Sequence, residues 1–261
     1  MGDISVVTGG ASGIGAACVQ KLAQAGSEVW ILDRDVAAAT HVAEAIRSVG
    51  GRAQSLEIDV SDAGAVDAAA EQVASEAGAP TALITAAGII ETVSTVLDAD
   101  LAAHDRLWAI NYGGTLNACR AFGRLMRDAG RGSIVTVGSV NSYAALPLPA
   151  YCPSKTAILR LVELLAVELG RFGVRVNGVA PTYVLTPGLQ AKVDAGERDI
   201  AKMLEVNALK TMVTPEDIAD VVAFLVSDAA RAVTGHMMPV DAGYIAAATF
   251  ATFAGGQPWE T

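Results

Sequence analysis

A tyrosine and a lysine stand four positions apart in the segment Tyr151-Cys152-Pro153-Ser154-Lys155, ahead of an apolar run at helical spacing. On a helix, positions i and i+4 share a face, so the phenol and the ammonium would lie close together. Pro153 fits only if the helix begins just before Tyr151, because the first turn needs no backbone donors. An adjacent cation lowers the pKa of a phenol, which can then accept the proton of an alcohol. The pair predicts Tyr151 as the proton-transferring residue, although this spacing alone is most often a solvated helix face.

Two further polar residues extend this site. Ser139 follows the apolar run from Ser133 to Val137, and its hydroxyl can hold a substrate oxygen. Asn111 lies in an Asn-Tyr-Gly-Gly segment and can bind a water that links Lys155 to solvent. Seen alone, the two are more simply a loop serine and an asparagine that kinks a helix. With Tyr151 and Lys155 they favour hydride and proton exchange between a secondary alcohol and a ketone, and Lys155 would also contact the nicotinamide ribose.

A glycine-rich segment near the amino end predicts a dinucleotide site. The first apolar run leads into Thr8-Gly9-Gly10-Ala11-Ser12-Gly13-Ile14-Gly15, directly before a helical pattern. Glycines allow a tight turn there, and backbone N–H groups can approach a pyrophosphate at the positive end of the helix. The residues expected to bind the cofactor are Gly9, Ser12, Gly13, Ile14 and Gly15. Taken by itself, such a glycine cluster is often only a turn.

Asp33 indicates which dinucleotide binds. It ends the second apolar run, twenty positions after the glycine at position 13, where a carboxylate can accept hydrogen bonds from the adenosine ribose. Its charge would repel a 2′-phosphate, so NAD is favoured over NADP. Arg34 opposes this interpretation, because a guanidinium can clamp that phosphate. Asp59 and Val60 follow the third run, where the adenine ring is expected.

Short β-branched runs alternate with longer amphipathic stretches along the chain. Near-continuous apolar strands separated by helices predict a parallel sheet covered on both faces, the doubly wound α/β fold. The predicted strands are Ile4–Thr8, Glu28–Asp33, Ala53–Ile58, Ala82–Ala86, Ser133–Val137, Arg175–Val179 and Met237–Val240. No linker or charge block interrupts the alternation, so a single domain over residues 1–261 is expected. Residues of about 186–212 are expected to form a substrate lid, and residues 245–261 a C-terminal tail.

Composition argues against several classes of function. The chain has 18 basic and 28 acidic residues, a net charge of −10, and no basic cluster, so nucleic acid is not an expected partner. No secretory signal precedes the first strand and no apolar run reaches the length of a membrane span, which predicts a cytoplasmic protein. Three cysteines and three histidines are scattered at spacings that fit neither a disulfide framework nor a metal site, so no catalytic metal is expected.

Together these motifs resemble the short-chain dehydrogenase/reductase family, from Ile4 to about Tyr244. The family's catalytic tetrad falls on Asn111, Ser139, Tyr151 and Lys155. The resemblance implies a Rossmann-type domain with a seven-stranded parallel sheet and helices on both faces, and a homotetramer or homodimer. It also implies cofactor contacts after the fourth and sixth strands, at Ala87, Gly88, Pro181, Val184 and Thr186.

The chain departs from the family pattern at three points. Thr85-Ala86-Ala87-Gly88 stands where the family has Asn-Asn-Ala-Gly, which puts in doubt the side-chain bonding that braces the sheet. Thr182 replaces the usual glycine after Pro181 and narrows or polarises the substrate mouth. The stretch from Ser139 to Tyr151 is one residue shorter than in many relatives, so its loop is expected to lie differently over the substrate.

The residues predicted to line the substrate pocket mix apolar and polar side chains, which suits a medium-sized secondary alcohol or its ketone. They are Ile89, Ile90, Asn141, Ser142, Thr182, Tyr183 and Leu189. A polyol, a sugar or a cyclic diol is the close alternative, and NADPH-dependent ketone reduction is another. From a different class, the chain can be a dinucleotide sensor without turnover. A sensor would not need the complete tetrad.

Overall fold

The computed structural model describes residues 3–251 of the chain. Seven parallel strands form one sheet in the order β3-β2-β1-β4-β5-β6-β7. The strands are β1 (Ile4–Thr8), β2 (Glu28–Asp33), β3 (Arg52–Glu57), β4 (Ala82–Thr85), β5 (Gly132–Val137), β6 (Val174–Pro181) and β7 (Met237–Val240). The predicted strands agree within one residue at each end, except that β6 is longer. It extends because Ala180 and Pro181 continue to pair with β7.

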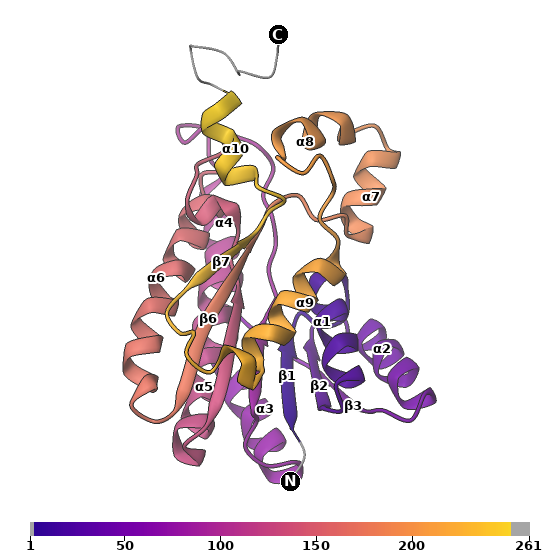
Figure 1. The fold of residues 1–261 in the computed structure, drawn as a ribbon, viewed down its shortest axis with the longest axis vertical. Helices are drawn as coiled ribbons and strands as arrows, with labels where there is room; N and C mark the ends of the chain where they lie inside the picture. The colour runs from indigo at the N-terminus through magenta and orange to yellow at the C-terminus, as the bar shows by residue number, and fades with distance from the viewer. Residues whose placement is uncertain (1–2, 252–261) are drawn as a thin grey trace.

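Helices join successive strands and cover both faces of the sheet (Figure 1). One face is covered by α3 (Ala63–Glu76), α5 (Gly114–Ala129) and α6 (Tyr151–Gly170). The other is covered by α1 (Gly13–Gln24), α2 (Val36–Ser48) and α9 (Pro215–Val226). The remaining helices are α4 (Leu101–Trp108), α7 (Pro187–Asp194), α8 (Ile200–Val206) and α10 (Tyr244–Ala251).

Each face of the sheet buries its own apolar core. Leu83 of β4 packs in one core with Phe122 of α5 and Ile158 of α6. Ile84, the next residue of β4, belongs to the other core with Ile218 of α9. Successive side chains of a strand point to opposite faces, so a strand buried on both sides must be apolar at every position. This confirms the predicted doubly wound α/β fold.

The sheet order reverses between β1 and β4, which lie side by side in the centre. The glycine-rich loop after β1 therefore meets the segment after β4. Gly9 has a φ of +68°, and a Cβ atom at this position would lie 2.5 Å from the backbone nitrogen of Ala87. Only glycine permits both the conformation and the close approach. Doubly wound proteins bind their ligands in the crevice at such a reversal point.

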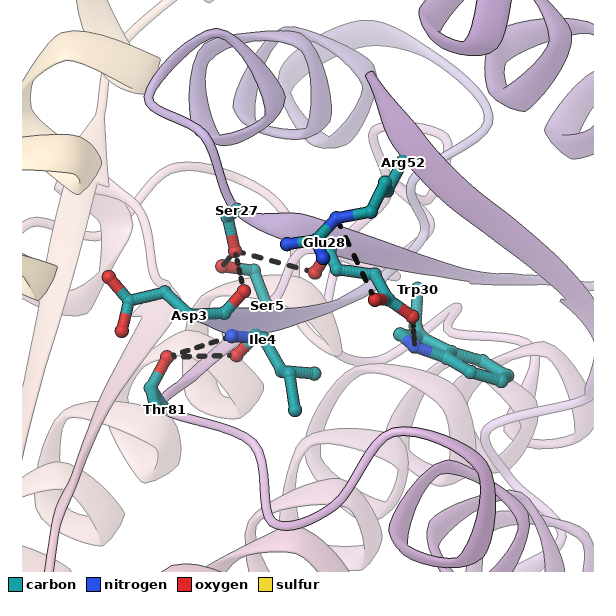
Figure 2. A network of polar contacts seen from close by, with 8 residues as sticks. All are labelled: Asp3, Ile4, Ser5, Ser27, Glu28, Trp30, Arg52 and Thr81. Atoms are coloured by element: carbon teal, nitrogen blue, oxygen red, sulfur yellow. Dashed lines mark hydrogen bonds and ion pairs between the residues drawn. The ribbon is translucent and has the colours of Figure 1, made fainter. Parts of the chain in front are cut away.

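The amino ends of the central strands are joined by a polar network (Figure 2). The hydroxyls of Ser5 and Ser27 are 2.7 Å apart, and Ser27 also donates to the carbonyl of Asp3. Thr81 Oγ1 accepts from Ile4 N and donates to Ile4 O, each at 3.1 Å. These contacts tie β1 to the segments that lead into β2 and β4. They hold the sheet at the end opposite the crevice.

The predicted lid forms two short helices, α7 and α8, beyond the carboxyl ends of the strands (Figure 1). Val184 pairs with Val213 in an isolated parallel bridge, and Leu185 N donates to Val213 O at 2.8 Å. The two ends of the lid segment are therefore held together at one place beside the sheet. Part of the predicted C-terminal tail is helical as α10, and residues 252–261 lie outside the described residues.

Candidate active site

A cavity of about 570 Å³ lies at the carboxyl ends of β1 to β4. Its lining includes most of the residues predicted to bind the cofactor, namely Gly9, Ser12, Gly13, Ile14, Gly15, Asp33, Arg34, Asp59, Val60, Ala87, Gly88 and Thr186. Sequence reasoning missed other lining residues, among them Leu32, Ile58, Ser61, Ala86, Arg106 and Ile110. Most of these are strand-end and helix residues whose apolar character is also that of the core, so no local signal separated them.

The amino end of α1 is prepared for an anion. Its N-cap residue, Ser12, is exposed and makes no side-chain capping bond, and the first turn of the helix contains no acidic residue. A side chain at Gly15 would overlap the carbonyl of Gly9, so the loop folds tightly against the helix start. Unpaired N–H groups and the positive end of the helix dipole favour a phosphate here. The residues present fit a dinucleotide pyrophosphate.

Asp33 connects the end of β2 to the glycine loop. Its Oδ2 accepts from Ala11 N and its Oδ1 from Asp35 N, both at 3.0 Å. Each carboxylate oxygen has further lone pairs, so the group can still accept hydrogen bonds from a ribose. Arg34 lines the same cavity and is exposed, and it forms no ion pair within residues 3–251. Asp33 and Arg34, whose charges predict opposite choices of dinucleotide, therefore both lie at this cavity.

Asp59 is held as a carboxylate beside Arg34. Hydrogen bonds from the hydroxyl and the backbone of Ser61 are the main cause that lowers the pKa of Asp59, and the charges of Arg34 and Arg106 add to it. Asp59 therefore adds a second negative charge to this cavity, beside that of Asp33. Arg106 enters from α4 and offsets part of that charge.

A second cavity, of about 660 Å³, continues from the first. The residues that line both are Ile14, Ala86, Gly88, Ile89, Thr186 and Gly188. This cavity contains three members of the predicted tetrad, Ser139, Tyr151 and Lys155, together with Pro181 and Val184. One cleft therefore joins the proposed adenosine end to the predicted catalytic residues.

The geometry around Tyr151 follows from the start of α6. The helix begins at Tyr151, as the position of Pro153 predicts, so the phenol and Lys155 share a face. Lys155 Nζ lies 5.5 Å from the centroid of the Tyr151 ring. Ser139 follows the end of β5, and a hydrogen bond between its hydroxyl and the phenol is one of the causes acting on the pKa of Tyr151. The same hydroxyl donates to Asn141 Oδ1 at 3.2 Å. The three side chains meet although they come from separate elements.

The lowered pKa expected for Tyr151 is not found in the protein alone. Burial raises the pKa of Tyr151, and the hydrogen bond from Ser139 opposes that rise only in part. Burial also lowers the pKa of Lys155 to about 8. Its Nζ donates to the carbonyl of Val137 at 2.8 Å. The prediction considered the cation and not the loss of water around the phenol, which is the larger effect here.

Asn111 lies in a π-helical turn, Ala109–Gly113, between α4 and α5. Its Oδ1 accepts from Ile89 N at 2.8 Å and its Nδ2 donates to Ile89 O at 2.9 Å. A Cβ atom on Gly88 would lie 3.3 Å from Asn111 Oδ1 and 3.9 Å from Lys155 Nζ, so these groups are neighbours. The side chain thus fixes the cleft wall beside Lys155, and the predicted bound water remains a prediction.

The predicted substrate residues line the second cavity with one exception. Those along the cavity are Ile89, Ile90, Asn141, Thr182, Tyr183 and Leu189. Ser142 is buried instead, and its hydroxyl donates to Lys155 O at 2.8 Å, so its assignment to the pocket is wrong. The short turn after β5 directs it toward α6. The prediction missed Glu91, Lys192, Arg198 and Tyr244, which reach the cavity from segments distant in sequence.

The departure from the family pattern at Thr85 has a structural counterpart. Thr85 and Thr136 face each other on β4 and β5, and both hydroxyls are buried without a hydrogen-bond partner in the described structure. An asparagine amide reaches further than a threonine hydroxyl and offers both donors and an acceptor. The side-chain brace doubted from the sequence is therefore absent at Thr85.

Replacing Lys155 with methionine is expected to stabilise the protein alone. A pKa of about 8 in place of 10.5 corresponds to a penalty of about 3 kcal/mol for the buried ammonium at pH 7. The lost bond to Val137 O offsets about 1 kcal/mol of this gain. Between pH 8 and 10.5, Lys155 binds fewer protons in the native protein than in the unfolded chain, so the penalty for burying its ammonium disappears as the pH rises. The stability gained by Lys155→Met should disappear over the same range.

Denaturant unfolding of Lys155→Met from pH 7 to 11 measures this effect. Lys202→Met, at an exposed lysine of α8, is the control and should change stability by less than about 0.5 kcal/mol. A Lys155→Met protein that is no more stable than the native protein at pH 7 would contradict the prediction.

Other kinds of site are not formed in the described part of the chain. Within residues 3–251, no three histidine, cysteine or acidic side chains lie together as metal ligands. None of the helices described combines the length and the apolar character needed to cross a membrane. Burial raises the pKa of Cys18 and of Cys119 to about 12, so both thiols stay protonated at neutral pH.

Comparisons with known proteins place the chain among dehydrogenases. A family model described as enoyl-(acyl carrier protein) reductase matches residues 9–245. Galactitol 2-dehydrogenase of Rhizobium johnstonii is 38% identical over 246 residues, which are 93% of this chain and 95% of that protein. Cis-4-hydroxycyclohexanecarboxylate dehydrogenase of Sinomonas cyclohexanicum is 38% identical over 245 residues, which are 93% and 96% of the two chains.

A solved structure from Brucella melitensis 16M, described as ribose-5-phosphate isomerase, has a TM-score of 0.91 and 39% identity, covering 98% of this chain and 97% of that one. Its description differs from those of the two dehydrogenases, while its fold is that of this chain. The match of the family model includes Gly9 to Gly15 and Tyr151. The chain belongs to the short-chain dehydrogenase/reductase family of oxidoreductases.

Proposed function

We propose that the protein is an NAD-dependent dehydrogenase that interconverts a secondary alcohol and its ketone, with Tyr151 as general base and acid. The observation that carries the proposal is the meeting of Ser139, Tyr151 and Lys155 at the wall of a cavity that opens into the dinucleotide cleft. A dehydrogenase needs hydride transfer and proton transfer at one carbon and its oxygen. In this proposal, the dinucleotide cleft holds the hydride acceptor and Tyr151 in the adjoining cavity transfers the proton.

The chain's own residues divide the work in this proposal. Ser139 holds the substrate oxygen, and Tyr151 removes its proton. At pH 7 most of Lys155 is protonated because its pKa is about 8, and its charge favours the phenolate of Tyr151. Asp33 binds the adenosine ribose, and Lys155 the nicotinamide ribose. A nicotinamide in the cleft supplies the hydride acceptor for the alcohol.

The cavity and the relatives support an alcohol with more than one polar group. The lining combines Ile89 and Ile90 with the polar side chains of Asn141 and Thr182. Galactitol is a polyol and 4-hydroxycyclohexanecarboxylate a cyclic alcohol, and the two relatives named for them are equally similar to this chain. A polyol, sugar or cyclic diol dehydrogenase of the same mechanism is therefore the close alternative. NADPH-dependent ketone reduction is a further one, favoured by Arg34.

Two functions from other classes are less well supported. A dinucleotide sensor would need the first cavity and not the contact between Ser139 and Tyr151. A sugar-phosphate isomerase, as the Brucella structure is described, would not need a dinucleotide cleft. Both alternatives predict no change in nicotinamide absorbance or fluorescence with any alcohol.

A screen of NADH fluorescence tests the proposal. The protein is mixed with NAD or NADP and a panel of secondary alcohols, polyols and cyclic diols, and with NADH or NADPH and the matching ketones. We expect NADH to form from NAD with at least one alcohol of the panel. With the same alcohol and NADP, NADPH should form much more slowly. Binding of NAD without turnover on any member of the panel would favour the sensor, and faster reaction with NADP would reverse the cofactor assignment.

Thr182→Val should make the enzyme discriminate against polyhydric substrates. Thr182 lines the substrate cavity, and its buried hydroxyl has no hydrogen-bond partner in the described structure. We propose that a second hydroxyl of the substrate supplies this partner when the Thr182 side chain turns toward the cavity. Valine has the same shape, so kcat/KM should fall about 3- to 10-fold for a vicinal diol and stay unchanged for the corresponding mono-alcohol. Equal effects on both substrates would contradict this role.

We also expect the protein to form a dimer or tetramer, as the resemblance to its family implies. Helix α6 has apolar side chains on the face turned away from its core, where Leu164 is 68% and Val167 83% exposed. Such a face is usually covered by another subunit. Sedimentation at micromolar concentration should find no monomer, and a clean monomer would refute the assignment.

A further inference from the structure

The start of α6 is capped from a distant part of the chain. Its own N-cap residue is Ala150, which has no side chain that can accept a hydrogen bond. Two backbone donors at this end, Ala150 N and Tyr151 N, both donate to Glu91 Oε1, at 2.8 and 2.6 Å. Pro153 has no donor, and Cys152 N donates to Leu148 O. A single carboxylate oxygen thus satisfies the free amides that the local sequence leaves at the helix start.

This cap has the physical features of a strong one. A carboxylate at a helix N-terminus is favoured by the helix dipole, and bonds from N–H groups to a charged acceptor are stronger than neutral ones. Glu91 is half-buried, so its bonds compete less with water than those of an exposed cap. The first residue of the helix is Tyr151 itself. No intervening turn separates the cap from the proposed general base.

The other side of Glu91 leads to the dinucleotide cleft. Two residues before it, Ile89 is clamped by both polar atoms of the Asn111 side chain and lines both cavities. The short segment from Gly88 to Glu91 therefore joins the wall of the cofactor cavity to the backbone of Tyr151. Glu91 also lines the substrate cavity. A shift of this carboxylate would move the phenol relative to Ser139 and to the cleft wall.

We propose that Glu91 is a positioning residue for the reaction, because its carboxylate fixes the start of α6 and with it the place of the Tyr151 phenol in the cleft. The inference rests on the proposed dehydrogenase function. A purely structural cap would stabilise the fold without affecting turnover at saturating substrate. A positioning cap affects kcat, because a displacement of the general base by about 1 Å can cost about 100-fold in rate.

Three variants separate the two roles. Glu91→Ala removes the cap, and Glu91→Gln keeps an acceptor oxygen at the same reach without the charge. Asp62→Ala is the matched control, because Asp62 Oδ1 also accepts from two amides, Gly64 N and Ala65 N, at the start of α3. Neither Asp62 nor α3 lines either of the two cavities described above. The control therefore loses a comparable cap away from the cleft.

We expect Glu91→Ala to lower kcat at least 10-fold with the KM for NAD changed less than 2-fold, and Glu91→Gln to restore kcat to within about 3-fold of the native enzyme. Asp62→Ala should lose stability and keep kcat. Hydrogen exchange of the peptide that contains residues 150 and 151 should speed up in Glu91→Ala and much less in Glu91→Gln. A Glu91→Ala enzyme with unchanged kcat, or an Asp62→Ala enzyme that loses as much kcat, would overturn the positioning role.

The outcomes also separate this inference from the proposed function. If the native protein oxidises no alcohol, the dehydrogenase proposal fails and the positioning role fails with it, whatever the hydrogen exchange shows. If the native protein turns over and Glu91→Ala exchanges no faster at residues 150 and 151, the cap itself is refuted while the dehydrogenase proposal stands.

Discussion

Tyr151→Phe should lower kcat about 1,000-fold or more while NAD binds with unchanged affinity. The substitution removes one oxygen atom, the one that Ser139 contacts and that the proposal assigns to proton transfer. The ring, the start of α6 and the cofactor cavity keep their packing. Steady-state kinetics with the best alcohol of the screen, together with fluorescence titration of NADH, measures turnover and binding separately.

Tyr143→Phe is the matched control for this variant. Tyr143 lies in the segment between β5 and α6, and its side chain is 47% exposed and does not line the substrate cavity. Its hydroxyl donates to Met237 O at 2.6 Å. Loss of that bond should reduce stability by about 1 kcal/mol and leave kcat unchanged. Turnover by Tyr151→Phe within 10-fold of the native rate would end the assignment of Tyr151 as the general base.

Asp33→Ser should invert the choice of cofactor. The carboxylate that repels a 2′-phosphate is lost, while Arg34 remains at the same cavity with no ion pair in the described structure. Bonds to a charged acceptor contribute about 1.5 to 3 kcal/mol, so kcat/KM with NAD should fall about 10- to 100-fold. The value with NADP should rise, because a serine offers the phosphate a donor in place of a charge.

Two controls show whether charge or loop geometry is responsible. Asp33→Asn keeps an acceptor for Ala11 N and removes the charge, so it should admit NADP while retaining much of the activity with NAD. Asp35→Ser changes the neighbouring carboxylate, which caps α2 by accepting from Ala38 N, and should not alter the NAD/NADP ratio. An unchanged ratio in Asp33→Ser would show that another residue selects the cofactor.

The order and type of the helices and strands could be predicted from the sequence because the patterns that indicate them are local. A run of apolar residues indicates a strand buried on both faces, and glycines between a strand and a helix indicate a cofactor loop. The bounds of β6 were too short because pairing of Ala180 and Pro181 with β7 depends on a partner strand far along the chain. Local pattern contains no information on that partner.

The site was less predictable where its properties depend on burial and on distant contacts. The pKa of Tyr151 was expected to fall beside Lys155, yet the removal of water from the phenol has the larger effect. Ser142 was expected at the substrate, yet it turns toward Lys155 O. Glu91 was missed because its bonds to the start of α6 join residues 59 and 60 positions apart, a separation that follows no helix or strand period.

The bridge between Val184 and Val213 bears on how this protein can diverge. Because that bridge fixes both ends of the intervening segment at one point, an insertion or deletion between them adds little to the entropy cost of closing the loop. The sheet and the groups at its carboxyl edge would not have to move. Under the proposed function, exchange of residues 187–206 as a module should therefore alter the substrate range, and grafting this segment from a relative would test that role.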